Sequence, residues 1–536
     1  QGVSSAASDV YKRQFRNVPK SVRERYLAMM QSSYNFIIEA AEHTQMKELC
    51  SMAYDVNLFL KGLMLNTDIE FEKLIYESGN DSLQTAYNKW RDLSLFNDRL
   101  SKQDTQDSLF SDSLMHLEQE LEYRLIRESK KYGSYVKGYS TTWKEIWKGL
   151  KKDDIAIEFC TYYSNNTEEY AAVLLEKKSK YPTVVRLFSQ KQLSTIPTTD
   201  YYNTTALSNL IWKPLHHYLA EKKNVYFSPS GELNNIAIEY IPLTDKKTFA
   251  EYYNTYRLSS TRELIKNKRE DIRTKAVLYG GLEYERGQGD IEAMRKELQS
   301  AESLIAFRDV PEIDSLVLRK GISFLEGTER EVQTIDTLLR NKQIPVALMS
   351  GMAGTEESFK QLSGQSITLL HVATHGFYSP LTGHYTAQRS FEEQALSRSG
   401  LFLSGAAASL NMKKIPEDIE DGILTAKELS KLDLSNLNLA ILSACQTGLG
   451  EIVGDGVFGL QRGFKKAGAQ TLLMSLWKVD DTATQLLMAE FYKNLVSGQN
   501  KRAAFLNAQK YLRSYQNGIY DKPEYWAAFI MLDGIH

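Results

Sequence analysis

The pattern of apolar and polar residues divides the chain into three parts. From residue 15 to about 150, apolar residues recur at spacings of three and four, as in "SVRERYLAMMQSSYNFIIEAAE" and "SDSLMHLEQELEYRLIRESKKY". This period is typical of amphipathic helices, so we predict a helical segment, either a plain bundle or the end of a helical repeat array. Residues 1–14 show no periodicity and no apolar stretch of a signal peptide, and we expect a non-native or disordered lead there.

Residues 151–270 contain short runs rich in β-branched and aromatic residues. "IAIEFCTYY", "EYAAVLLEK" and "PTVVRLF" predict strands, and "KNVYFSPSGELNNIAIEYI" predicts a strand, a turn and a second strand. Cys160 lies inside an apolar run, which favours a structural, buried cysteine. We expect this part to complete or support the sheet of the part that follows.

From residue 271 to the end of the chain, predicted strands and helices alternate. The strands include "KAVLYGGLEY", "IPVALMSG", "ITLLHVATHG", "LNLAILSAC" and "AQTLLMSLW". Thr328 and Glu331 have the spacing of a capping box at the start of a helix. The alternation predicts an α/β fold with a mostly parallel sheet flanked by helices. The stretch of about 44 residues from Phe377 to Glu420 is predicted to be a loop, and we expect a lid or activation segment in it.

The totals exclude several classes of protein. The chain has 65 basic and 67 acidic residues and a formal net charge of -2, which gives no global attraction to nucleic acid. No apolar run reaches the roughly 18 residues of a transmembrane helix. The three cysteines are widely spaced and form no CxxC pair, so neither a disulfide framework nor a cysteine metal site is expected, and we expect a cytoplasmic location.

Two successive strands of the last part end on side chains that can carry acyl-transfer chemistry. "ITLLHVATHG" ends at His375 and Gly376, and "LNLAILSAC" ends at Cys445. Sites in open α/β sheets lie beyond the carboxyl ends of the strands, and successive strands are usually neighbours. We therefore expect His375 and Cys445 to meet, as the base and nucleophile of a thiol hydrolase do. The backbone N–H groups of Gly376 and Cys445 would form the oxyanion hole.

Each of these residues also has an alternative role. A lone cysteine after an apolar strand is often structural, and a histidine at a strand end is often a capped or buried imidazole. His371 and His375 face one side of the predicted strand, but residue 372 is valine and no third ligand is present, which disfavours a metal site. We expect His371 to be a hydrogen-bonded core histidine. The joint pattern of His375 and Cys445 favours catalysis without a metal or an organic cofactor.

At these motifs the chain resembles the CHAT domain family, bacterial relatives of caspases and separases. The resemblance covers about residue 155 to the C-terminus and is carried by "LLHVATHGFY", "DGILTAKEL", "LAILSACQTGLGE", "GVFGLQRGFKKAGAQTLLMSLWKVDDTAT" and "YWAAFIMLDG". It implies a caspase-like fold, with a pseudo-catalytic part over residues 151–270 and a catalytic part over residues 271–536. It also implies a cysteine endopeptidase dyad of His375 and Cys445, with Gly376 in the oxyanion hole. Family members usually carry tetratricopeptide repeats upstream and are often linked to regulated cleavage of a partner protein in bacterial defence or cell death.

The substrate-binding residues are less clearly marked. Related proteases that cut after basic residues have an acidic S1 pocket. Five residues that follow the two relevant strands are candidates for such a pocket: Glu451, Asp455, Trp477, Asp480 and Asp481. The alternative for the Asp pair is a helix N-cap. Trp477 would form a wall of the pocket, and its alternative role is core packing.

Two functions remain open from the sequence. The first is a regulated cysteine endopeptidase that cleaves a protein partner, and the second is a non-catalytic or latent scaffold or sensor that binds a partner through the helical segment and the caspase-like domain. The intact dyad favours the first. We expect no direct nucleic-acid binding, because the chain has no Walker motif and no basic aromatic cluster.

Overall fold

The computed structural model describes most of the chain. The described residues are 20–61, 71–72, 74–76, 78–100, 108–129, 141–245, 247–266, 275–285, 307–309, 322–379, 391–410, 414–416, 420–444, 448, 450–453 and 456–535. The predicted lead, Cys445 and Asp455 lie outside these ranges. Among the helices within them, none combines the length and the apolar content that crossing a bilayer requires.

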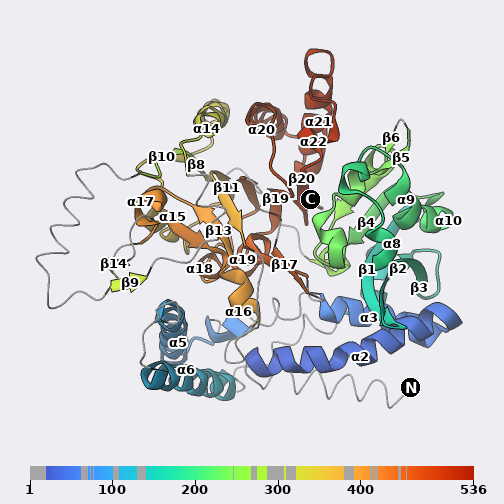
Figure 1. Ribbon diagram of the computed structural model, residues 1–536, viewed down its shortest axis with the longest axis horizontal. Helices are drawn as coiled ribbons and strands as arrows, with labels where there is room; N and C mark the ends of the chain where they lie inside the picture. Colours follow the sequence, from blue (N-terminus) through green and yellow to red (C-terminus); the bar gives the residue numbers. More distant parts are fainter. Residues whose placement is uncertain are drawn as a thin grey trace, which may run out of the picture.

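One eleven-stranded sheet carries both the strand-rich part and the α/β part of the chain (Figure 1). Its spatial order is β10-β8-β11-β16-β19-β20-β7-β4-β1-β2-β3. In chain order the strands are β1 (Asp154–Ser164), β2 (Thr167–Glu176), β3 (Thr183–Ser189), β4 (Asn224–Ser228), β7 (Asn254–Arg257), β8 (Ala276–Leu282), β10 (Val346–Gly351), β11 (Leu369–Ala373), β16 (Leu439–Ser443), β19 (Thr471–Ser475) and β20 (Phe529–Leu532). The central strands are continuous apolar runs, as a sheet covered on both faces requires.

The sheet consists of two halves that run in opposite directions. Strands β10, β8, β11, β16 and β19 are parallel to one another, and β20 is antiparallel to β19. Strand β20 pairs in parallel with β7 through Leu532 and Arg257, and β4 and β1 continue in the same direction. Strands β2 and β3 follow as antiparallel neighbours. The predicted mostly parallel sheet is confirmed, and the carboxyl ends of the two sets of strands lie at opposite edges.

Helices cover both faces of the C-terminal half. On one face, α14 (Glu326–Arg340) packs on β8 and on α20 (Asp481–Val496), which contacts α21 (Lys501–Ser514). The approach to β8 is close, because a Cβ on Gly280 would lie 2.5 Å from Val332 of α14. The opposite face is covered by α15 (Glu356–Lys360), whose Phe359 ring lies 5.3 Å from that of Tyr279. Lys360 links α15 to α18 (Ala426–Leu429), which packs on α19 (Leu460–Lys466).

The helical segment forms a layer on the N-terminal half of the sheet. Helices α2 (Lys20–Thr44), α3 (Lys47–Leu60) and α7 (Trp143–Gly149) share a core with Ala156 and Cys160 of β1. The alternate residues of β1 pack on the other face with Trp212. The predicted helices of this segment are confirmed, and they include α5 (Asp81–Leu100) and α6 (Ser108–Ser129), which share a separate small core. The buried, structural role expected for Cys160 is also confirmed.

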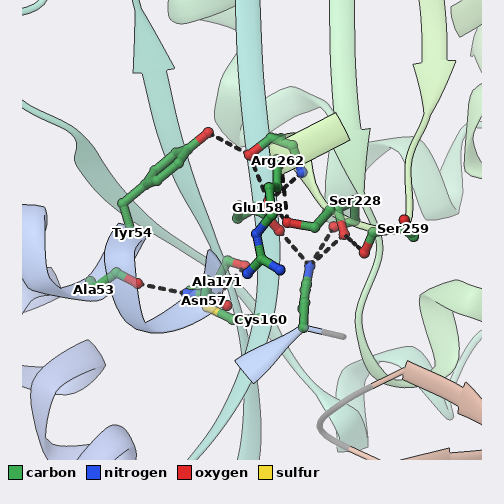
Figure 2. A network of polar contacts seen from close by, with 12 residues as sticks. Ala53, Tyr54, Asn57, Glu158, Cys160, Ala171, Ser228, Ser259 and Arg262 are labelled. Atoms are coloured by element: carbon green, nitrogen blue, oxygen red, sulfur yellow. Dashed lines mark hydrogen bonds and ion pairs between the residues drawn. The ribbon is translucent and has the colours of Figure 1, made fainter. Parts of the chain in front are cut away.

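A buried ion pair joins this helical layer to the sheet (Figure 2). Lys61, directly after α3, places its Nζ 2.9 Å from Glu158 Oε2, and both side chains are almost fully buried. The same Nζ donates to the carbonyl and the hydroxyl of Ser228 at the end of β4. The second Glu158 oxygen accepts hydrogen bonds from the Thr261 N–H and hydroxyl and from Ser260. The carboxylate is therefore paired and hydrogen-bonded, which is the condition for burying a charge.

The predicted loop from Phe377 to Glu420 is wrong. The chain forms β12 (Gly376–Tyr378), α16 (Phe391–Leu396), β13 (Ser399–Phe402), α17 (Ala406–Leu410) and β14 (Lys414–Pro416) there. Strands β12 and β13 build a small antiparallel sheet with β15 (Ile423–Thr425), and β17 (Gly450–Val453) pairs with β18 (Gly456–Gly459). Strands of three or four residues are too short for a period to be recognised. The expected lid falls partly on residues 380–390, 411–413 and 417–419, which lie outside the described residues.

Two smaller predictions are also wrong. The second strand of "KNVYFSPSGELNNIAIEYI" is replaced by the 3-10 turns η4 (Gly231–Asn235) and η5 (Ile238–Tyr240), because the guanidinium of Arg257 binds the Ile236 carbonyl and the Glu239 carboxylate. The capping box is absent because α14 begins at Glu326, before Thr328.

Candidate active site

The strands that end at the two predicted dyad residues are direct neighbours. Strands β11 and β16 pair in parallel, with Ala373 opposite Ser443. His375 and Cys445 each follow these paired residues by two positions. The chain also reverses its direction across the sheet here, because β10 lies on one side of β8 and β11 on the other. Such a switch point is where open α/β sheets bind ligands.

His375 is held in a defined orientation by two neighbours. Its Nε2 lies 2.8 Å from the carbonyl oxygen of Ser323, in the stretch that leads into α14. Its ring lies 5.2 Å from the ring of Tyr284, two residues after β8. Because a carbonyl can only accept, Nε2 carries the proton, which leaves Nδ1 of the neutral ring as the proton acceptor.

The surroundings of His375 have opposing effects on its proton affinity. Burial lowers the pKa of this imidazole below its ordinary value, and the charge of Lys478 acts in the same direction. The hydrogen bond to Ser323 and the charge of Asp481 oppose this lowering of the pKa. The net lowering keeps His375 in its neutral, proton-accepting form at neutral pH.

Cys445 itself lies outside the described residues, but the residues around it are attached to β19. Ser475, at the end of β19, donates from its hydroxyl to the carbonyl of Ala444, which directly precedes Cys445. The Gly448 N–H donates to the carbonyl of the same serine at 2.8 Å. The chain on both sides of Cys445 is therefore bound to one residue of the neighbouring strand.

Gly376 begins β12, and its backbone N–H points away from β13. Phe402 N donates to the carbonyl of His375 at 2.9 Å, and the register pairs Gly376 with Leu401. Hydrogen-bonded and non-hydrogen-bonded pairs alternate along an antiparallel ladder, so Gly376 and Leu401 form a non-hydrogen-bonded pair. The Gly376 N–H is thus not used by this ladder, as an oxyanion donor requires.

The other two cysteines are poorly reactive by their surroundings. Cys50 and Cys160 are both buried and free. Burial raises the pKa of the Cys50 thiol, and it raises the pKa of the Cys160 thiol to about 11. Both thiols therefore stay protonated at neutral pH, and a protonated thiol is a much weaker nucleophile than a thiolate.

The Asp pair among the S1 candidates is divided between two roles. Asp480 is the N-cap of α20, and its Oδ1 accepts from Ala483 N at 2.9 Å, which is the alternative role that the sequence indicated. Asp481, in the first turn of α20, lies close enough to His375 for its charge to raise the pKa of that imidazole.

The remaining described candidates lie in different surroundings. Glu451, in β17, accepts a hydrogen bond from the Tyr378 hydroxyl at 3.1 Å, and this tyrosine follows Gly376 by two residues in β12. The Trp477 ring lies 5.2 Å from the ring of Tyr202 and packs against the core. Glu451 is therefore the S1 candidate that contacts β12, the strand that begins at Gly376.

His371 is a fully buried core histidine, as predicted. Its Nε2 lies 2.8 Å from Glu331 Oε1, and its Nδ1 lies 3.2 Å from the Tyr492 hydroxyl. The Glu331 side chain thus contacts His371 of β11 and does not cap the start of α14. Both imidazole nitrogens have protein partners, which disfavours His371 as a metal ligand.

One group of carboxylates in the described ranges has spacing suited to a metal ion, and a lysine lies among them. Glu356, Glu420 and Glu428 bring their oxygens within 4.8 Å of one another. Lys360 Nζ lies 2.7, 2.8 and 3.4 Å from these three carboxylates. The ammonium group makes this cluster an ion-pair network.

Ser323 and Tyr284 are the site residues that sequence reasoning missed. Ser323 acts through its backbone carbonyl, which leaves no signal in the residue type. Tyr284 follows β8, the parallel neighbour of β11, and its hydroxyl lies 2.9 Å from that of Thr374. The rule that sites collect at the carboxyl ends of strands would have identified Tyr284.

Known proteins share parts of this chain. Tetratricopeptide repeat protein 28 is 34% identical over 110 residues in Mus musculus and 32% identical over 114 residues in Homo sapiens. The matches cover 20% and 21% of this chain and only 4% of each relative.

Among solved structures, the Saccharomyces cerevisiae separase–securin complex has a TM-score of 0.40 at 11% identity and covers 82% of this chain and 35% of that one. The Arg-specific cysteine proteinase gingipain R (RgpB of Porphyromonas gingivalis) has a TM-score of 0.34 at 10% identity and covers 61% and 68%. Likeness at these scores decides nothing about activity.

The model of the CHAT domain matches residues 203–534, more than half of the chain and including both His375 and Cys445. The chain belongs to the CHAT domain family.

Proposed function

We propose that the chain is a cysteine endopeptidase of the caspase and separase type, in which Cys445 is the nucleophile and His375 transfers the proton. The observation that carries this proposal is the parallel pairing of β11 with β16, with Ala373 opposite Ser443. In the sequence, a histidine and a cysteine each follow this pair by two positions, beyond the carboxyl ends of two neighbouring parallel strands. The membership in the CHAT family supports a peptidase as the class of enzyme.

In the proposed mechanism, His375 and Cys445 carry the proton transfer and the covalent step, and two backbone N–H groups stabilise the oxyanion. His375 Nδ1 takes the thiol proton of Cys445, and the thiolate sulfur forms a bond to the scissile carbonyl carbon. The oxyanion of the tetrahedral intermediate accepts hydrogen bonds from the N–H groups of Gly376 and Cys445. The C–N bond breaks as His375 returns its proton to the leaving amine. Water then attacks the thioester, and the thiol and a free carboxylate are released.

A thiol-reactive probe tests the proposed nucleophile. At pH 7 we expect iodoacetamide to label Cys445 at least about tenfold faster than Cys50 or Cys160, whose raised pKa values keep them protonated. His375→Ala should remove this advantage, because the acceptor of the thiol proton is lost. The labelled cysteines are identified by mass spectrometry of the digested protein. Labelling of Cys445 that stays as slow as that of Cys160 with a protein partner present would rule out the dyad.

An acidic S1 pocket built on Glu451 extends the proposal to substrate choice. Its carboxylate is held by the Tyr378 hydroxyl beside the strand of Gly376, where a basic P1 side chain would lie. For peptides with arginine at P1, Glu451→Gln should lower kcat/KM by about tenfold or more, the usual scale of a lost charged hydrogen bond. The rate of Cys445 alkylation should not change. Equal losses for peptides with arginine and with alanine at P1 would contradict the assignment.

A latent scaffold or sensor is the second candidate function. Large apolar side chains of the helical segment face solvent, with Phe36 of α2 exposed by 69% and Tyr123 of α6 by 54%. Phe and Tyr are enriched in protein–protein interfaces, so these are the positions at which a scaffold would contact a partner. In a scaffold, the labelling of Cys445 would be insensitive to His375→Ala, so the experiment above separates the two functions.

A further inference from the structure

A buried imidazole connects the two helices that flank His375. His371, in the middle of β11, contacts Glu331 of α14 through Nε2 at 2.8 Å and Tyr492 of α20 through Nδ1 at 3.2 Å. His371 and Tyr492 are fully buried, and Glu331 is nearly so. None of the three takes part in the proposed chemistry.

The start of α14 delivers the carbonyl that orients His375. Ser323 lies three residues before the helix begins at Glu326, and its oxygen binds His375 Nε2. The Thr328 hydroxyl ties this start to β8, because it accepts from Gly281 N at 3.0 Å and donates to the Leu325 carbonyl at 2.7 Å. The position of the Ser323 carbonyl thus depends on how α14 is seated on the sheet.

The start of α20 delivers the carboxylate that acts on His375. Asp481 is the first residue of α20 and lies against Gly327 in the first turn of α14. Its charge raises the pKa of His375, and Lys478, in the stretch before α20, acts in the opposite direction. Among the residues that the structure describes, Asp481 and Lys478 act on His375 by their charges, and Tyr284 contacts its ring.

We propose that His371 is a positioning residue, which seats α14 through Glu331 and α20 through Tyr492 so that Ser323 and Asp481 stay in place around the catalytic His375. The importance of this role for catalysis rests on the proposed function, but the effect of His371 on the orientation of His375 does not depend on it. His371 lies in β11 and contacts α14 in the core, and His375, two residues after the strand, contacts the stretch that leads into the same helix. Hydrogen bonds behind a catalytic or ligating histidine commonly fix its tautomer and orientation in this way.

Two conservative variants weaken the two contacts without removing a large volume. Tyr492→Phe deletes the hydroxyl that contacts His371 Nδ1, and Glu331→Gln removes the negative charge that faces His371 Nε2. Tyr54→Phe is the matched control, because Tyr54 is also fully buried and its hydroxyl also has one partner, Thr261, at 2.8 Å. This control lies in the helical layer, far from β11 in the fold. His371→Leu is a fourth variant, informative only if it folds.

The direct readout is the tautomer and the titration midpoint of the His375 imidazole. They are measured in the full-length protein carrying Cys445→Ala, because this change removes the thiol that would titrate together with the imidazole. In 15N-histidine NMR, its signal is assigned by its loss in His375→Ala. We expect a pure Nε2–H tautomer in the parent. Tyr492→Phe and Glu331→Gln should lower its titration midpoint and mix the tautomers, because the Ser323 hydrogen bond and the Asp481 charge both favour the protonated ring. Asp481→Asn should lower the midpoint directly, and Tyr54→Phe should leave it unchanged.

The possible outcomes are separable. If Tyr492→Phe and Glu331→Gln lower the melting temperature as Tyr54→Phe does but leave the midpoint and tautomer of His375 unchanged, His371 is only a core residue and the inference is overturned. In protein that retains Cys445, the same variants should slow its alkylation at pH 7 by about three- to tenfold. If the NMR signal responds while Cys445 of the wild-type protein is unreactive, the positioning role stands and the proposed peptidase fails.

Discussion

Replacing Cys445 by alanine is expected to abolish cleavage of a protein partner, and replacing His375 by alanine is expected to slow it by about a thousandfold or more. The first change removes the only protein atom that forms a bond to the substrate in the proposed mechanism. The second leaves a thiol without a proton acceptor and a leaving amine without a proton donor. The measurement is mass spectrometry of new protein termini after the wild type and each variant are incubated with the products of neighbouring genes.

The control for this experiment is Cys160→Ala. Cys160 is equally a cysteine in an apolar strand, but it is buried on the opposite half of the sheet, and its loss should leave the pattern of new termini unchanged. New termini that persist in Cys445→Ala would show that the dyad is not the source of the cleavage. Wild-type protein that cuts none of these partners, together with slow labelling of Cys445, would leave the scaffold as the function.

Lys61→Met is expected to have the largest effect on stability. The change removes the cation from Glu158, whose Oε2 has Lys61 as its ion-pair partner at 2.9 Å in the buried interior. Breaking a buried pair by removing one member usually costs about 3–5 kcal/mol, because the remaining charge is uncompensated. We also expect faster hydrogen exchange in α2 and α3, because Lys61 joins the end of α3 to β1 and β4. Urea unfolding and peptide-resolved exchange measure the two effects.

Lys222→Met is the matched control for this result. Lys222 Nζ also lies 2.9 Å from a buried carboxylate, that of Glu176 at the end of β2, but this pair does not include the helical segment. The control should destabilise the protein without a selective increase of exchange in α3. Adding Glu158→Gln to Lys61→Met should recover part of the loss, since the uncompensated charge is then gone. Equal exchange in α3 for the two lysine variants would show that Lys61 does not couple the layer to the sheet.

The C-terminal half could be predicted from the sequence because its signals are local. Each strand of this half is a short apolar run, and α14 and α21 have a clear helical period. The adjacency of β11 and β16 therefore followed from the order of the elements. His371 was also predicted as a buried histidine from its place within an apolar run. What the sequence did not reveal is its partner, because Glu331 lies 40 residues away and its spacing from Thr328 is that of a capping box.

The rest of the site could not be predicted because it depends on pairs that are distant in the chain. Ser323 orients His375 from 52 residues away through a backbone atom, and any residue type offers the same carbonyl. The three-stranded sheet of β12, β13 and β15 consists of strands of three or four residues, which are stabilised by one another and by contacts such as that between the Phe377 and Phe402 rings. The parallel pairing of β20 with β7 through Leu532 and Arg257, the joint between the two halves of the sheet, cannot be recognised from the sequence of either strand alone.

That joint also limits how copies of this chain can associate. Strand β20 would be an open edge if the C-terminal half stood alone, but β7 occupies its free side. Within the part of the chain that the structure describes, the large sheet keeps only β10 and β3 as unpaired edges. Exposed edges are where strands of another molecule can be added. Assembly by strand addition would therefore take place at the far ends of the sheet, and the seam between its two halves is closed to it.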